Sequence, residues 1–204
     1  MKTRCVGLGA MGEPIAGHLH SRGLLAVVGN RSIAKAQVLA EKLSVNAAHA
    51  SHYFSDCDVV VLCVSRDADV LENVNVLAGI LRAGAVVVDH STVSVETAKH
   101  AQKILAERNI GFIDAPVSGG VEGARNGKLS IMVGGSEADL EKIRPVLDAY
   151  AAKITHMGDT GAGQATKAVN QVLVAGIAQA VCEGLALGEK LGLKPELLIP
   201  TLAA

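Results

Sequence analysis

The sequence predicts an α/β fold of the Rossmann type: a mostly parallel, doubly wound sheet followed by the first long helix of an incomplete all-α domain. Three observations support this prediction. Short apolar runs alternate with amphipathic helical segments through residues 1–160, a glycine-rich turn follows the first run, and from residue 161 the pattern changes to a long helix over 164–191. We therefore expect a nucleotide-binding domain over 1–160 and the start of a helical domain over 161–204.

The alternation can be followed element by element. The expected strands cover residues 5–6, 25–28, 59–64, 85–89, 110–114, 129–133 and 153–156. The expected helices cover residues 11–21, 33–43, 95–108, 137–150 and 164–191, and a last one begins at 194–195. The run 59–64 is continuously apolar, which is typical of a strand buried on both faces. Helices between such strands serve as crossovers, so the strands are expected to run parallel.

Polar residues and glycines gather in the loops that follow these strands. The loops are residues 7–12, 30–32, 64–66, 89–94 and 114–120. In an open parallel sheet, ligands bind beyond the carboxyl ends of the strands. We therefore expect the functional site in these loops.

A G-x-G-x-x-G turn, G-L-G-A-M-G, lies between the first strand and the first helix. The bare pattern arises by chance in roughly one chain in four of this glycine content, so its position is what makes it informative. Gly7 makes the tight turn, Gly9 admits the pyrophosphate to the backbone, and Gly12 lets the helix pack close to the strand. The sequence thus predicts a dinucleotide site that includes Leu8, Ala10, Met11, Cys63 and Val64 as well as these glycines.

The end of the second strand indicates which dinucleotide binds. An NAD site usually has Asp or Glu there, whereas this chain has Asn30, followed by Arg31 and Ser32. A neutral amide does not repel a 2′-phosphate, and the planar guanidinium of Arg31 can donate to it. NADP is the predicted cofactor, with NAD as the alternative.

Composition and charge exclude several other classes of protein. The formal net charge of -1 gives no reason to expect a nucleic acid or an anionic membrane as partner. The four cysteines lack C-x-x-C spacing, the histidines lack metal-ligand spacing, and we expect no metal site. Residues 1–4 lead almost directly into the glycine turn, so we expect no signal peptide and a location in the cytoplasm or an organelle matrix.

The helix over 164–191 is small or apolar almost all round. Asn170, Gln171 and Gln179 interrupt it, so we do not expect it to span a membrane. Such a helix needs cover on more than one side. We expect either a second copy of the chain, giving a homo-oligomer through this helix, or a longer protein of which this is a C-terminally truncated version.

Four segments in order resemble the β-hydroxyacid dehydrogenase family, which includes 3-hydroxyisobutyrate dehydrogenase, tartronate semialdehyde reductase and 6-phosphogluconate dehydrogenase. They are G-L-G-A-M-G at 7–12, D-H-S-T at 89–92, D-A-P-V-S-G-G at 114–120 and G-A-G-Q-A-T-K-A-V-N-Q at 161–171. The resemblance covers essentially the whole chain, and the last two segments are far more specific than the glycine turn. Two positions depart from the family pattern: Val95 replaces a usual proline, and Gln171 stands where many members have Asn.

The resemblance implies roles for residues that match the family motifs. Ser118, Gly119 and Gly120 look like the loop that binds the substrate carboxylate. Lys167 looks like the catalytic lysine with Asn170 and Gln171 as amides beside it, and Thr92 looks like the residue against the nicotinamide. The resemblance further implies an all-α C-terminal domain that drives oligomerisation and closes the cleft.

The chemistry of Lys167 follows from what hydride transfer needs. A group that takes up or gives the hydroxyl proton must have a pKa near neutrality, so the lysine pKa must fall from about 10.4 to about 7–8. Burial and the positive start of a helix would both lower it, and its sequence neighbours include no carboxylate. The leading hypothesis is an oxidoreductase that interconverts a short 3-hydroxyacid, a small carboxylate substrate, and its semialdehyde. The alternative is a non-catalytic NADP-binding or oligomer-forming remnant of such an enzyme.

Overall fold

The computed structural model describes residues 1–49 and 56–202. The chain divides into two compact units, Met1–Lys167 and Ala168–Ala204, and each is described by itself. The sequence pattern changes at 160–161, but the start of the long helix, up to Lys167, belongs to the first unit.

The first unit is built on a nine-stranded sheet of order β3-β2-β1-β4-β5-β6-β8-β7, with β9 paired to β8. Its strands are β1 (Thr3–Val6), β2 (Leu25–Asn30), β3 (Asn46–His49), β4 (Val59–Leu62), β5 (Val86–Asp89), β6 (Gly111–Asp114), β7 (Val117–Ser118), β8 (Leu129–Gly134) and β9 (Ala151–Gly158). The pairs among β1 to β6 are all parallel. Strand β8 runs antiparallel to β6 and β7, while β9 is parallel to β8. The predicted mostly parallel Rossmann sheet is confirmed.

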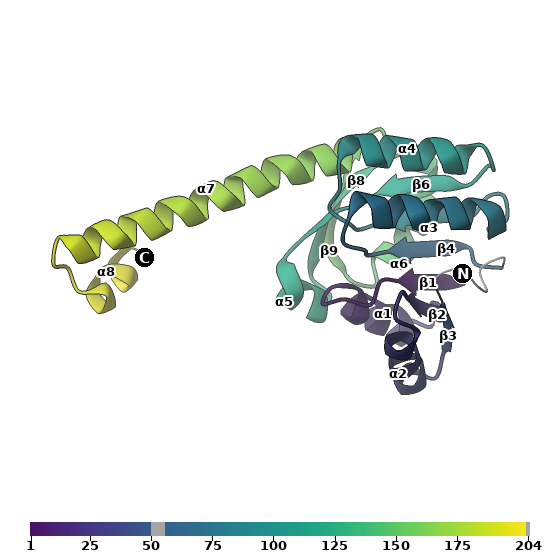
Figure 1. Cartoon of the computed structure of the whole chain (residues 1–204), viewed down its shortest axis with the longest axis horizontal. Coiled ribbons are helices and arrows are strands. Elements are labelled where there is room, and N and C mark those ends of the chain that lie inside the picture. Colours follow the sequence, from purple (N-terminus) through teal and green to yellow (C-terminus); the bar gives the residue numbers. More distant parts are fainter. Residues whose placement is uncertain (50–55, 203–204) are drawn as a thin grey trace. The chain divides into compact units, whose positions relative to one another are not determined.

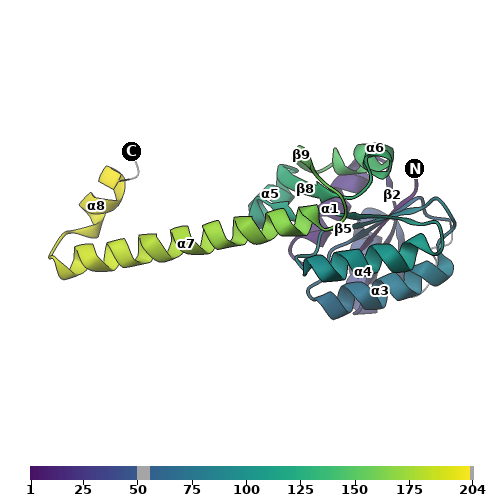
Figure 2. The ribbon, with the colours of Figure 1, turned by 90° about the horizontal axis from the view of Figure 1, so that it is seen from above.

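Helices cover both faces of this sheet. They are α1 (Gly12–Ser21), α2 (Ile33–Leu43), α3 (Asp67–Ile80), α4 (Val95–Ala106), α5 (Gly120–Arg125) and α6 (Glu137–Leu147). Helices α3 and α4 pack side by side on one face, and α1, α2 and α6 lie on the other (Figures 1 and 2). Neighbouring residues of a central strand supply the two cores alternately: Val59 and Val61 face the α1 side, Val60 faces the α3 side. This explains why the sequence of β4 is apolar without interruption.

Local signals explain where several helices begin and end. Ser94 caps α4 by accepting a hydrogen bond from the Thr97 amide, and Ser136 caps α6 in the same way. Gly23, at φ 68°, follows the last turn of α1 in the left-handed conformation that glycine adopts without strain. The first turn of α1 differs, because Met11 stands at its N-cap and makes no side-chain capping bond, while the Glu13 amide donates to the Gly9 carbonyl at 3.1 Å.

Four elements have no counterpart in the sequence prediction. Strand β3 reads N-A-A-H and lacks the β-branched and aromatic residues that mark strands, so only its backbone pairing with β2 reveals it. Helix α3 contains two asparagines and a glycine, which weaken its intrinsic helical signal, although Val70, Val74 and Leu77 form its buried face. The short β7 and α5 occupy the predicted loop 114–120 and the residues after it.

The second unit continues α7 (Ala162–Lys190) from Ala168 and ends with α8 (Pro195–Leu202). Within this unit α8 packs against the end of α7. The Leu198 side chain lies so close to Gly188 that a Cβ there would be 2.6 Å from it. The apolar side chains of α7 are exposed: Val169, Val172, Leu173, Val174, Ile177 and Val181. By length and composition alone α7 could cross a membrane, which is weak support for a membrane span.

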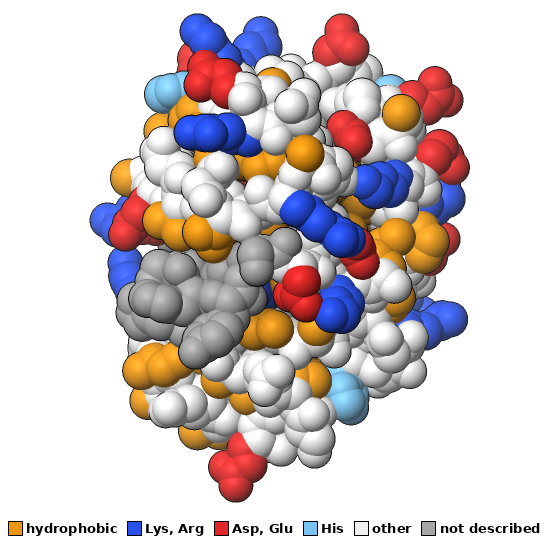
Figure 3. Space-filling model, turned by 90° about the vertical axis from the view of Figure 1, so that its right-hand side faces the viewer, with side chains coloured by type: hydrophobic (Ala, Val, Ile, Leu, Met, Phe, Trp, Pro, Cys, Tyr) orange, Lys and Arg blue, Asp and Glu red, His pale blue; other side chains and the backbone are white. Residues whose placement is uncertain are grey.

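The face of the molecule in Figure 3 carries cationic and anionic side chains interspersed with apolar ones.

Candidate cofactor and catalytic site

The turn between β1 and α1 has the geometry of a phosphate cradle. A Cβ at Gly7, whose φ is 90°, would lie 2.2 Å from the carbonyl oxygen of Cys63, and a Cβ at Gly12 would lie 1.8 Å from that of Gly7. Both positions therefore exclude any side chain. A Cβ at Gly9 would meet no atom within 4 Å, so the backbone there is open to a ligand. With the uncapped start of α1 beside it, this turn suits an anion.

A cavity of about 400 Å³ opens from this turn along the carboxyl ends of β1, β2 and β4. Of the residues predicted to bind the cofactor, eight line it: Gly7, Leu8, Gly9, Asn30, Arg31, Ser32, Cys63 and Val64. Ala10, Met11, Gly12 and Thr92 do not. Gly12 does not line the cavity, but its backbone lies close to the Gly7 carbonyl and so supports the turn. Met11 packs against the core. The cavity thus gathers three loops that are far apart in the sequence.

Asn30 and Arg31 have different roles at the end of β2. The Oδ1 atom of Asn30 accepts a hydrogen bond from the Leu8 amide at 3.2 Å, and its Nδ2 donates to the Ser32 carbonyl at 3.3 Å. The amide of Asn30 therefore holds the glycine turn against the second loop. Arg31 remains 85% exposed and forms an ion pair of 3.8 Å with Asp69 of α3.

Two buried carboxyl groups lie next to each other where β5 and β6 end, since Asp89 and Asp114 are partners in the sheet register. The Oδ1 atom of Asp89 accepts from the Ser91 amide at 2.9 Å, while its Oδ2 has no hydrogen-bond partner among the described residues. Burial raises the pKa of Asp89 to about 7, and burial also raises the pKa of Asp114.

Asp114 anchors the start of α7. Its two carboxylate oxygens accept from the Gly161 and Gln164 amides, at 2.7 and 2.9 Å. The Gln164 side chain donates to the Ser91 carbonyl at 2.7 Å and accepts from the Val93 amide at 3.2 Å. These four bonds tie the first turn of α7 to the ends of β5 and β6, which is why that turn belongs to the first unit.

Lys167 lies one turn further along and reaches the loop after β6. Its Nζ donates to the carbonyl of Val117 at 2.8 Å. The side chain is half-buried, and burial lowers the pKa of Lys167 below its usual value. The direction agrees with the expectation; the positive start of the helix was expected to lower the pKa as well, but the buried carboxylate of Asp114 caps that start. Burial is the cause that the structure supports.

The remaining predicted residues lie in three other segments. Ser118 follows Val117 directly, and Gly119 and Gly120, with φ of 120° and 61°, are exposed at the start of α5. Thr92 is exposed between Ser91 and Val93, the two residues that Gln164 binds. Asn170 and Gln171 belong to the second unit, where the Asn170 amide donates to Gln171 Oε1 at 3.3 Å.

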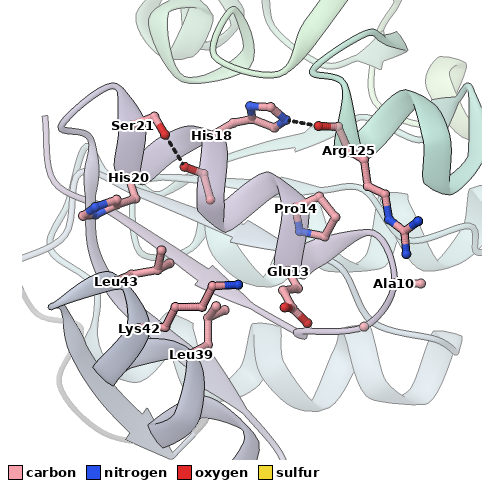
Figure 4. Close-up of a pocket in the computed structure, with 12 residues that line it drawn as sticks. Ala10, Glu13, Pro14, His18, His20, Ser21, Leu39, Lys42, Leu43 and Arg125 are labelled. Carbon is pink, nitrogen blue, oxygen red and sulfur yellow. Dashed lines mark hydrogen bonds between the residues drawn. The ribbon is translucent and has the colours of Figure 1, made fainter.

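A second cavity, of about 520 Å³, lies between α1, α2 and α5 (Figure 4). Glu13, His20, Lys42 and Arg125 line it with polar side chains. On its rim, His18 Nε2 is 2.9 Å from the Ala124 carbonyl and 3.1 Å from that of Arg125. This contact connects the helix after the glycine turn to the helix after the Ser118 loop.

Sequence reasoning did not identify Asp69, Asp114 or Gln164 as site residues. Asp114 and Gln164 stand inside the two most specific family segments, so the motif itself was the signal available. Asp69 lies in α3, a helix that the sequence reading had not identified. Among residues 1–49 and 56–202, no group of three or more His, Cys, Asp or Glu side chains could hold a metal ion.

Comparison with known proteins extends these observations. Residues 2–158 match the family described as the NAD binding domain of 6-phosphogluconate dehydrogenase, and residues 161–204 match the family described as NAD-binding of NADP-dependent 3-hydroxyisobutyrate dehydrogenase. The chain is 40% identical to 2-(hydroxymethyl)glutarate dehydrogenase of Eubacterium barkeri over 201 residues, which is 96% of this chain and 66% of that protein. The chain therefore spans about two thirds of the length of such curated relatives.

Solved structures agree with the sequence relatives. The structure of Mycobacterium tuberculosis 3-hydroxyisobutyrate dehydrogenase with L-serine superposes with a TM-score of 0.89 at 32% identity, covering 99% of this chain and 70% of that one. Psf3 in complex with NADP+ and 2-OPP gives 0.84 at 28% identity, covering 97% and 71%. With its glycine cradle, its carboxyl-edge cavity and these relatives, the chain belongs to the β-hydroxyacid dehydrogenase family of NAD(P)-dependent oxidoreductases.

Proposed function

We propose that this chain takes part in interconverting a short 3-hydroxyacid and its semialdehyde with NADP(H), and that Lys167 exchanges the proton. The observation that carries the proposal is the position of Lys167. Its amine lies 2.8 Å from the Val117 carbonyl, directly before the Ser118-Gly119-Gly120 turn, and burial lowers its pKa. An amine in that position can hydrogen-bond to the hydroxyl or carbonyl oxygen of a substrate whose carboxylate is bound by the turn.

The residues of the first cavity fit the cofactor. The glycine turn excludes side chains at Gly7 and Gly12 and leaves Gly9 open, as a bound pyrophosphate requires. Asn30 brings no negative charge to the end of β2, and the exposed Arg31 can donate to a 2′-phosphate. The relatives include an NADP-dependent family and a structure with NADP+, which favours NADP over NAD as the proposed cofactor.

When bound, the nicotinamide supplies or accepts the hydride. The side chains of the protein must then transfer the proton. For reduction of a semialdehyde, Lys167 as an ammonium gives a proton to the developing alkoxide; for oxidation, the neutral amine removes the hydroxyl proton. The Ser118 hydroxyl and the amides of Gly119 and Gly120, in a turn with left-handed glycines, can donate to the substrate carboxylate. Asn170 and Gln171 are proposed to orient the substrate without adding charge.

A reduction assay tests the proposal. NADPH oxidation is followed with a panel of small carboxylated aldehydes: glyoxylate and the semialdehydes of methylmalonate, tartronate and succinate. We expect turnover of at least one of them, with kcat falling as pH rises through the lowered pKa of Lys167, because reduction needs the protonated amine.

Two substitutions separate catalysis from stability. Lys167→Ala should lower kcat by about 10²–10⁴-fold with NADPH affinity retained. Lys190→Ala, in the last turn of the same helix, is the matched control and should leave kcat unchanged. Unaltered turnover in Lys167→Ala would contradict the proposed mechanism. NADPH binding without turnover of any aldehyde would instead favour a cofactor-binding chain without catalysis.

We also propose that the chain forms a homo-oligomer through helix 164–191 and resides in the cytoplasm. The row of exposed apolar side chains on α7 is what an oligomer would cover. Light scattering after gel filtration should show more than one copy, and Val172→Glu should reduce the mass. Val38→Glu is the matched control, because Val38 and Val172 are 71% and 72% exposed. A wild-type monomer in detergent-free buffer would contradict this assembly.

A further inference from the structure

A second arginine that no motif predicted, Arg66, shares a carboxylate with Arg31 at the edge of the cofactor cavity. Arg66 is the N-cap residue of α3, and Asp69 is the third residue of that helix. The Nε atom of Arg66 donates to Asp69 Oδ2 at 3.1 Å, and its Nη2 donates to Oδ1 at 3.0 Å. Arg31 approaches the same Oδ1 atom, but only to 3.8 Å. One carboxylate therefore lies between two guanidinium groups at the edge of the cavity.

Asp69 is a problem for a cofactor with a 2′-phosphate. Its side chain is 16% exposed and lines the cavity, as Glu72 does one turn later. A phosphate monoester carries a charge of about −1.5 to −2 at pH 7. A bare carboxylate there would repel the phosphate and would compete with it for Arg31. Something has to neutralise Asp69 and engage both of its oxygens.

We propose that Arg66 is a specificity-determining residue for the cofactor: by engaging both oxygens of Asp69, it leaves Arg31 available to the 2′-phosphate of NADP. This inference rests on the proposed function, in which Arg31 binds that phosphate. Arg66 is not among the residues that line the cavity, so it acts through Asp69 and needs no contact with the cofactor. NAD lacks the 2′-phosphate, so its affinity does not depend on Arg66.

Two further features agree with this arrangement. The hydrogen bonds from Arg66 are the main cause of a lowered pKa of Asp69, as expected for a carboxylate held by a guanidinium. Arg31, in contrast, keeps a side chain that is 85% exposed and lies beside Asn30 and Ser32 at the end of β2. Lys35 also lines the cavity and adds a second cation to its lining.

The test is a double-mutant cycle on nucleotide binding by the 204-residue chain, with Kd values for NADPH and NADH measured by calorimetry. Arg66→Gln should weaken NADPH binding about fivefold, equivalent to about 1 kcal/mol, while NADH binding changes less than about twofold. In the Asp69→Asn background, which lacks the competing carboxylate, Arg66→Gln should change NADPH binding by less than about twofold. Arg144→Gln is the matched control, because Arg144 also pairs with a carboxylate three residues away, Glu141 on α6, although in the reverse order along the chain.

The other outcomes decide against the inference in distinguishable ways. If Arg66→Gln left the ratio of the two Kd values unchanged, the Arg66–Asp69 pair would only stabilise the start of α3, and the inference would be overturned. If the loss of NADPH affinity persisted in the Asp69→Asn background, Arg66 would bind the phosphate directly, and the route through Asp69 would be overturned. If the wild-type chain bound neither nucleotide, the proposed function itself would fail.

Discussion

Replacing Gly12 by alanine should damage both stability and cofactor binding, while the same change five residues later in the same helix should not. A Cβ at Gly12 would lie 1.8 Å from the Gly7 carbonyl oxygen, and such contacts are essentially never shorter than 3.0 Å. The neighbouring atom is backbone, so the start of α1 or the phosphate turn has to move by at least 1.2 Å. At Gly17 a Cβ would meet no atom within 4 Å.

The magnitudes follow from these two environments. Overpacking of this kind costs about 1–3 kcal/mol, so Gly12→Ala should lower Tm by roughly 2–10 °C in a chain of this size. Gly17→Ala removes the backbone entropy cost of a glycine inside a helix and should stabilise by about 0.5–1 kcal/mol. NADPH affinity should fall at least about tenfold in Gly12→Ala, because the amides at the start of α1 move away from the pyrophosphate.

Thermal unfolding by circular dichroism and calorimetric titration with NADPH measure both effects. The opposite signs of the two stability changes are the sharp part of this prediction. If Gly12→Ala proved as stable as Gly17→Ala and bound NADPH normally, the close approach of α1 to the turn would not be what requires glycine there.

Three other predictions concern the same first unit. Gly9→Ala should leave Tm within about 2 °C but weaken NADPH binding at least about tenfold, because its Cβ would enter only the open space of the cavity; equal affinity would place the pyrophosphate elsewhere. Asp114→Ala should cost about 2–3 kcal/mol in urea unfolding, since two amides at the start of α7 lose a charged acceptor, and a cost below about 0.5 kcal/mol would refute that anchoring role. Burial raises the pKa of Asp89 to about 7, so its contribution to folding should be fully present below about pH 4 and lost as pH rises to about 7; Asp89→Asn should flatten that part of the pH dependence of unfolding.

Much of the fold could be predicted because its signals are local. The alternation of apolar runs with amphipathic helices gave most strands and helices within a few residues, and the position of the glycine turn gave the nucleotide edge of the sheet. The elements that were not predicted carry weak local signals. Strand β3 is defined by pairing with β2, and α3 by burial of three apolar side chains against the sheet.

The site shows the same division. Motif spacing was sufficient to select Gly7, Gly9, Asn30 and Arg31, which the structure brings to one cavity. Motif spacing could not reveal that Asp69, from a different helix, reaches within 3.8 Å of Arg31. The expected lowering of the Lys167 pKa is confirmed, with burial as its cause, but motif spacing could not reveal that Asp114, 47 residues before Gly161, caps the helix that carries this lysine.

The sequence by itself determined most of the strands and helices in their order, the dinucleotide turn and the lysine with its motif, because each of these depends on residues within about one or two helical turns of one another. Only the tertiary structure decided which distant groups meet: Asp114 with the start of α7, Gln164 with the end of β5, and Arg66 and Asp69 with Arg31. The physical reason is that the parallel sheet brings the carboxyl ends of its strands to one edge. Charges and hydrogen-bonding groups far apart in the chain are set within a few ångströms there, and no local pattern records their distances.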